Sequence, residues 1–130
     1  MRVNFVDDNT VSSFLAKTIY RAAEVVEEIS EEILKSTTED FTDEEADMNV
    51  YFTPYAFDED TSTEVAVIVT REYPMDATGE ALLERADRIA VTTQAFQEEI
   101  YNLTGVLAPI VNVGDYEAIN DFLTGAPNGA

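Results

Sequence analysis

Apolar residues recur in steps of three and four over the first third of the chain. The members of this stripe are Leu15, Ile19, Ala22, Val26, Ile29 and Ile33. This spacing places one side of an α-helix against a core. Asp8 or Asn9 has the short polar side chain that is preferred just before the first helical turn. The pattern therefore predicts a long helix from Asn9 to Ser36.

A second stripe with the same spacing lies in the last third of the chain. It consists of Leu82, Ala86, Ile89, Thr93, Phe96, Ile100 and Leu103. Pro74 precedes it and Gly105 follows it, as is typical of the two ends of a helix. A seam of this length could also form a coiled coil, but Ala and Thr within it favour packing against a sheet. We expect a second helix from Asp76 to Thr104.

Two strands are predicted between these helices. Residues 48–53 alternate between apolar and polar side chains, which is the period of a strand with one apolar face. Val65–Val69 is a continuous apolar run, which is typical of a central strand covered on both faces. The polar loop between the two runs indicates a hairpin. Arg2–Val6 predicts a first strand and Leu107–Val113 a last one, at an edge because of Pro109.

The predicted order is strand, helix, strand, strand, helix, strand, followed by a short helix at residues 115–123. This order predicts an α+β fold of the ferredoxin-like, split βαβ kind. Its four-stranded sheet would be antiparallel, with both long helices on one face. Residues 1–124 would form a single domain containing an acidic connector at 37–47, and residues 125–130 a C-terminal tail.

Charge is distributed very unevenly along the chain. The 130 residues carry 27 acidic and 7 basic side chains, which gives a net charge of −20. Between Glu24 and Glu64 there are fifteen carboxylates and one basic residue, Lys35. Such a segment attracts cations and basic proteins and repels polyanions, so direct binding to nucleic acid is not expected.

The sequence lacks two of the residue types that enzymes use most often in catalysis. The chain contains no Cys and no His, which removes the usual zinc ligands, the thiol nucleophile and the ordinary base near neutral pH. We expect a protein that is not an enzyme and that has no cofactor or metal site. No signal-peptide pattern and no apolar run of membrane-spanning length occurs, so we expect a soluble protein, cytoplasmic or part of a virus particle.

The acidic residues allow three interpretations. They could keep the surface hydrated in a saline interior, as in halophilic proteins, they could bind cations diffusely, or they could bind a basic protein partner. In the last case the carboxylates would imitate the phosphate backbone of DNA or RNA. The residues predicted to bind a partner are Glu24, Glu27, Glu28, Glu31, Glu32, Glu39, Asp40, Asp43, Glu44, Glu45 and Asp47, together with Tyr51 and Tyr55 as an exposed aromatic patch.

Two functions remain open from the sequence. The first is a homo-oligomeric structural protein, for instance a ring or connector component of a virus particle, that uses its sheet edges, the Tyr51 and Tyr55 region and its C-terminal segment as contacts. The second is a nucleic-acid mimic that inhibits a protein handling DNA or RNA through residues 24–47. Both are binding functions, and they differ in the partner.

Overall fold

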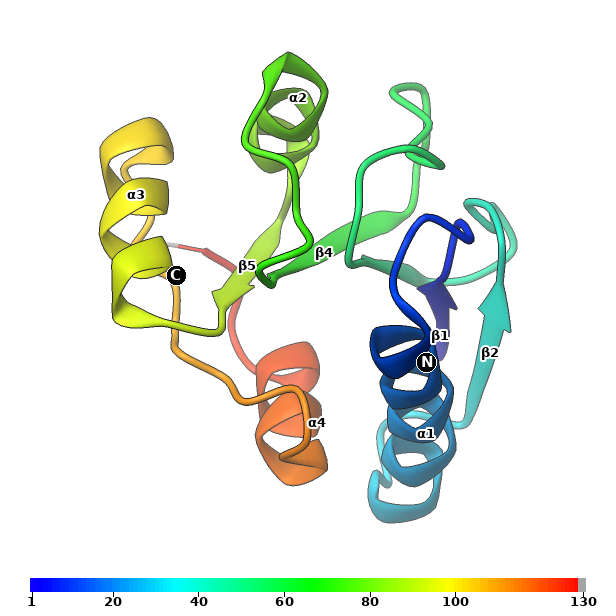
Figure 1. Cartoon of the computed structure of the whole chain (residues 1–130). Helices are drawn as coiled ribbons and strands as arrows, with labels where there is room; N and C mark the ends of the chain where they lie inside the picture. The colour runs from blue at the N-terminus through cyan, green and yellow to red at the C-terminus, as the bar shows by residue number, and fades with distance from the viewer. Residues whose placement is uncertain (129–130) are drawn as a thin grey trace.

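The computed structural model describes residues 1–128 as one sheet with helices on both of its faces (Figure 1). Its elements are β1 (Arg2–Val6), α1 (Ser13–Ile29), β2 (Lys35–Glu39), β3 (Met48–Tyr51), β4 (Glu64–Val69), α2 (Ala77–Arg85), β5 (Arg88–Val91), α3 (Gln94–Thr104) and α4 (Tyr116–Thr124). The strands predicted near residues 2–6, 48–52 and 65–69 and the short C-terminal helix are confirmed as elements.

The sheet itself differs from the prediction. It has five strands in the order β2-β1-β3-β4-β5, and every neighbouring pair is parallel. The predicted antiparallel four-stranded, ferredoxin-like sheet is therefore wrong. The observed strand order is that of flavodoxin-like, doubly wound folds, in which the direction of winding reverses between β1 and β3.

Two apolar cores lie on opposite faces of the sheet. On one face, α1 and α4 bury Ile19 and Ile119 against Phe5, Val50 and Ile68. On the other face, side chains from α2 and α3 pack with those of β4 and β5, including Leu82, Ile100 and Val67. The prediction that both long helices share one face is wrong, and the continuous apolar run of β4 is explained by burial on both sides.

The first helix is shorter than its apolar stripe. The hydroxyl of Ser12 caps it by accepting a hydrogen bond from the Leu15 amide at 3.2 Å, and the helix ends at Ile29. The backbone is extended at Ser30, and Ile33 is buried from the following turn. Residues 35–39, predicted as helix and connector, form β2 instead.

The predicted second helix is two helices separated by a strand. Asp76 caps α2, and Thr93 caps α3 by accepting a hydrogen bond from the Phe96 amide at 3.2 Å. Between them residues 88–91 form β5, whose side chains are all buried. Leu82 and Ile100 pack in the same core, so the stripe continues across the break.

Two long connections without a helix complete the crossovers. Residues 40–47 lead from β2 to β3, and residues 52–63 lead from β3 to β4. The second was predicted to be a hairpin loop, but it joins parallel strands, which requires a longer return path. The last predicted strand is only an isolated bridge between Val91 and Ile110. The predicted tail is described as far as Asn128, and residues 129 and 130 lie outside the described part.

Candidate functional site

The two edge strands of the sheet, β5 and β2, differ in whether other backbone segments pair with their outer sides. Later segments close the outer edge of β5: the Val91 amide donates to Pro109 O at 3.0 Å, and the Val111 amide donates to Val91 O at 2.7 Å. Asn128 continues this closure, since its amide donates to Asp87 O at 2.9 Å. At the other end of the sheet, β2 pairs with β1 alone, and within residues 1–128 no strand covers its outer side. An open strand edge offers unpaired backbone groups to another chain.

The pairing with β1 determines which residues of β2 face outward. The Asp7 amide donates to Glu39 O at 2.9 Å, so alternate residues from Glu39 back to Lys35 direct their backbone groups toward β1. Ser36 and Thr38 therefore direct theirs away from the sheet. Thr37 instead places its side chain on the connector face, where its hydroxyl donates to Asn4 Oδ1 at 3.1 Å.

One outward amide of β2 is held by an acidic side chain of α1. The Ser36 amide donates to Glu27 Oε2 at 2.9 Å, and the Ser36 hydroxyl lies 2.5 Å from Ala23 O. The backbone hydrogen bond, followed by the hydroxyl contact, lowers the pKa of Glu27 below its ordinary value of 4.5. A charged Glu27 thus occupies a backbone donor at the open edge.

The predicted acidic residues lie on three segments around β2. Glu24, Glu27 and Glu28 lie on α1, Glu31 and Glu32 in the turn before β2, and Glu39, Asp40, Asp43, Glu44, Glu45 and Asp47 at the end of β2 and in the connector. All of them are exposed except the half-buried Asp43. The acids of α1, of the turn before β2 and at the end of β2 flank the open edge, whereas Asp43, Glu44 and Asp47 contact β1, β3 and the loop before β4. Figure 1 shows α1 beside β1 and β2 at the right of the sheet.

The two predicted tyrosines do not form a patch. Tyr55 is 55% exposed, whereas Tyr51 is fully buried. The Tyr51 ring packs edge-on against Phe57 at 5.7 Å, and its hydroxyl contacts Thr42 Oγ1. Burial raises the pKa of Tyr51 to about 12. The prediction that Tyr51 is exposed is wrong, because it belongs to a strand covered on both faces.

A buried polar row holds the connector against the sheet. The Asn4 side-chain amide donates to Asn49 Oδ1 at 2.9 Å, and Asn49 donates to Asp43 O at 3.0 Å. The Asp43 amide returns a hydrogen bond to Asn49 Oδ1 at 2.9 Å. Sequence reasoning missed this row because polar residues at alternate strand positions were taken to face solvent.

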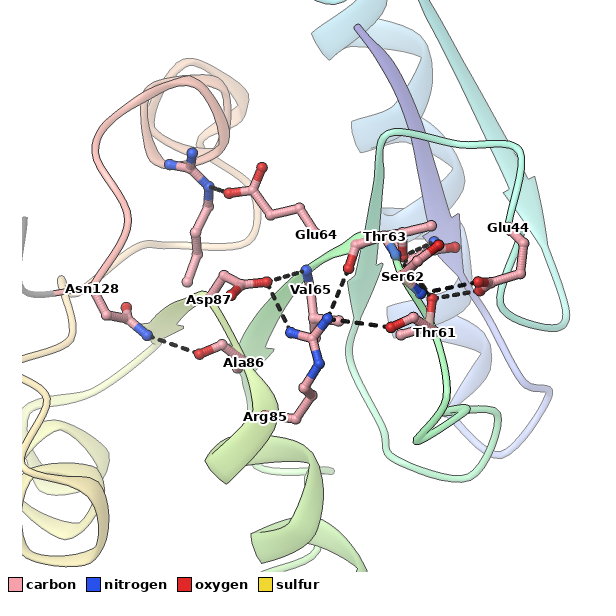
Figure 2. A network of polar contacts seen from close by, with 12 residues as sticks. Glu44, Thr61, Ser62, Thr63, Glu64, Val65, Arg85, Ala86, Asp87 and Asn128 are labelled. Atoms are coloured by element: carbon pink, nitrogen blue, oxygen red, sulfur yellow. Dashed lines mark hydrogen bonds and ion pairs between the residues drawn. The ribbon is translucent and has the colours of Figure 1, made fainter.

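Figure 2 shows how the connector is joined to the amino ends of β4 and β5. Glu44 accepts a hydrogen bond from the Ser62 amide at 3.1 Å and contacts the Thr61 hydroxyl. Arg85 donates to Thr63 O at 3.0 Å and forms an ion pair with Asp87, also at 3.0 Å. Glu44 is thus one predicted partner residue that the fold also uses internally.

The carboxyl ends of the strands are the usual ligand site of such folds, at the point where the winding reverses. Here that place is filled by hydrogen bonds within the chain. Asp8 accepts hydrogen bonds from the Thr53 hydroxyl at 2.6 Å and from the Thr10 amide at 3.1 Å. Glu72 accepts from the Ser12 amide at 2.5 Å and thereby covers the start of α1. Within residues 1–128, no group of three or more acidic side chains is arranged to hold a metal ion.

Comparisons with protein-family models, curated proteins and solved structures gave no match. Within the described residues, no helix has both the length and the apolar character needed to span a membrane. The geometry of the open edge and its surroundings therefore carries the functional argument.

Proposed function

We propose that this chain is a non-enzymatic, acidic binding and assembly subunit whose contacts form around the outer edge of β2. The observation that carries this proposal is the difference between the two sheet edges. Two C-terminal segments close β5, whereas β2 is left open and is flanked by carboxylates. An edge strand that is neither paired nor covered adds a strand from another chain most readily.

The filled carboxyl-end crevice supports binding over catalysis. Asp8 and Glu72, which occupy the usual ligand position, are already engaged by hydroxyl and amide groups of the chain itself. A substrate would have to displace these hydrogen bonds before it could contact either carboxylate. The acidic side chains of α1 and of the turn before β2 are instead exposed to solvent.

Sedimentation velocity of the full chain at low, intermediate and high salt tests this function. Two copies with a net charge of −20 repel each other over long distances, and salt shortens that range from about 30 Å at 0.01 M to about 10 Å at 0.1 M. We expect self-association to strengthen as salt rises. A chain that stays monomeric at every salt concentration and binds no added basic polypeptide would contradict the proposal.

The nucleic-acid mimic is the second candidate. It is favoured by the exposure of the acidic side chains of α1 and by their closeness along one helix, at positions 24, 27 and 28. A complex of this kind depends on counterion release and dissociates as salt rises. The two functions therefore predict opposite responses in one salt series, in which poly-lysine serves as the basic probe.

A further inference from the structure

We propose that the open edge of β2 pairs with the same strand of a second copy, antiparallel about Thr37, so that one continuous ten-stranded sheet runs through a symmetric dimer. This inference rests on the proposed assembly function and names the partner as another copy of this chain. Two independent observations carry it, namely the order of charges along β2 and the order of charges along α1.

The first observation is that β2 is self-complementary. Lys35 and Glu39 stand two residues on either side of Thr37, and both are exposed. Because side chains alternate along a strand, these three lie on the same face. In an antiparallel pair centred on Thr37, Lys35 of each copy lies opposite Glu39 of the other. Opposite charges facing each other across strands stabilise a pair, whereas like charges destabilise it.

The backbone groups fit the same arrangement. Ser36 and Thr38 direct their N–H and C=O groups outward, and in this register Ser36 of one copy lies opposite Thr38 of the other. Two residues that face each other with outward backbone groups exchange two hydrogen bonds. The two pairs of Ser36 with Thr38 therefore give four hydrogen bonds. The Ser36 amide is free for this exchange only after Glu27 has released it. In the single chain, Glu27 therefore keeps the Ser36 amide from pairing with another strand.

The second observation is the order of charges along α1. Lys17 lies in its first half, Arg21 at its middle, and Glu24, Glu27 and Glu28 in its second half. The proposed two-fold axis is perpendicular to the sheet, so the two α1 helices lie on one face and run antiparallel. The basic half of each helix then lies beside the acidic half of the other. One two-fold axis thus brings opposite charges together on both β2 and α1.

The centres of the two charge patterns lie close together. The contact between the Ser36 hydroxyl and Ala23 O sets α1 and β2 at a common level. One residue along a strand spans about 3.3 Å and one residue along a helix about 1.5 Å, so Thr37 lies level with about residue 21 of α1. Lys17 is about four residues before this level and Glu27 about six after it. When Glu27 leaves Ser36, Lys17 of the second copy lies on the same side of the axis and offers it a cation across the interface.

The spacing also allows the helices to pack. Strands lie about 4.8 Å apart, and α1 contacts both β1 and β2, which puts two such helices about 10 Å apart across the axis. This is the ordinary distance of packed helices. The surface of α1 on this side carries a shallow groove lined by Ala16, Lys17, Tyr20 and Glu24. A two-fold contact of this kind closes at two copies and does not form a ring.

Two charge reversals test the pairing. Lys35→Glu and Glu39→Lys each place two like-charged pairs across the axis, and we expect each variant alone to dimerise roughly tenfold more weakly than the wild type. Mixed in equal amounts, the two variants regain opposite charges at both pairs, so a heterodimer should form with nearly wild-type affinity. Arg71→Glu and Glu84→Lys change the net charge equally at exposed sites away from β2 and should leave the affinity unchanged.

A cross-link gives the second measurement. The chain has no Cys, and the two Thr37 residues of an antiparallel pair face each other about 4.5 Å apart at Cα, which is within reach of a disulfide. Mild oxidation should convert Thr37→Cys into a covalent dimer, whereas Thr78→Cys, exposed on α2, should stay monomeric.

The outcomes separate this inference from the proposed function. If the wild type self-associates but the mixed reversals do not recover and Thr37→Cys does not cross-link, the dimer geometry is wrong and the assembly function stands. If the wild type stays monomeric but binds poly-lysine, and Thr38→Pro abolishes that binding, the edge belongs to a basic partner and the homodimer is overturned. If the wild type neither self-associates nor binds poly-lysine, both proposals fail.

Discussion

The guanidinium of Arg88 in β5 lies 2.6 Å from the carboxylate of Glu64 at the start of β4, and it also contacts the carbonyl of Gly125. One side chain thus joins two strands to the C-terminal segment. Its own side chain is only 10% exposed, so the charge is largely removed from water and depends on these partners.

We therefore expect Arg88→Met to destabilise the chain by about 2–4 kcal/mol, because Glu64 loses its cation and the Gly125 carbonyl loses its donor. Urea unfolding followed by circular dichroism measures the change. The matched control is Arg21→Met, which removes the exposed ion pair with Glu24 and should cost less than about 0.5 kcal/mol. Equal losses of unfolding free energy in the two variants would show that burial of Arg88 does not make its contacts more stabilising.

The buried polar row predicts an effect that is not additive. Asn49→Leu leaves the Asp43 backbone groups and the Asn4 amide without their partner, at a cost of about 2–3 kcal/mol. Adding Asn4→Leu removes the second partner as well, so the double variant should lose less than the sum of the single losses. Urea midpoints of the four proteins close this cycle, and Asn102→Leu on the exposed side of α3 is the control. Strict additivity would mean that Asn4 and Asn49 act independently.

Glu27 should titrate below an ordinary glutamate. Its pKa is lowered by the Ser36 amide and hydroxyl, so the contact stabilises the fold above pH 4.5 and is lost as the pH falls through the lowered pKa. Carboxyl chemical shifts measured by NMR give this value directly. Ser36→Ala removes the hydroxyl and keeps the amide, so it should move the pKa only part of the way back to 4.5. A complete return would show that the backbone contact does not form.

The buried tyrosine hydroxyls predict base sensitivity. Burial raises the pKa of Tyr51 to about 12 and raises that of Tyr73 as well. Since these pKa values are raised, the stabilisation is complete below the ordinary value of 10 and is lost as the pH rises further. Ultraviolet absorbance should show a late phase of tyrosine ionisation that coincides with unfolding. Tyr51→Phe should reduce the amplitude of that phase, and an unchanged amplitude would place the Tyr51 hydroxyl in solvent.

Most elements were predictable from local pattern, but their connections were not. The run Val65–Val69 and the alternation after Met48 identify strands, yet neither says whether neighbouring strands run parallel. The direction depends on the path of residues 52–63, which return to the amino end of the sheet without a helix. Polarity of a loop carries no information about that path.

β5 was missed because its side chains continue the helical stripe. Leu82 and Ile100 belong to one core on either side of it, and Ile89 fits both a helix face and a buried strand. A short apolar run of this kind cannot be assigned from periodicity alone. β2 was missed for the opposite reason, since its sequence from Lys35 to Glu39 contains no apolar residue. An edge strand needs few apolar residues, because it is less covered than a central strand.

The acidic segment is evident from the sequence, but its relation to a sheet edge was not foreseen. That relation requires β2, which lies within the predicted first helix and connector. Without β2, the carboxylates from Glu24 to Asp47 form one charged stretch. With β2 in place, those on α1 and in the turn before β2 border a strand, and Glu27 contacts the backbone of that strand.

In the proposed dimer, the closure of β5 by Pro109, Val111 and Asn128 leaves each copy one open edge, so strand pairing stops at two copies. A copy with one open strand edge can pair with one neighbour, and that pairing leaves no second edge for a third copy. If β5 were open as well, each copy would offer an edge at both ends of its sheet, and copies could add into a growing fibre. In the proposed assembly, the segments that close β5 therefore separate a discrete dimer from an open-ended polymer.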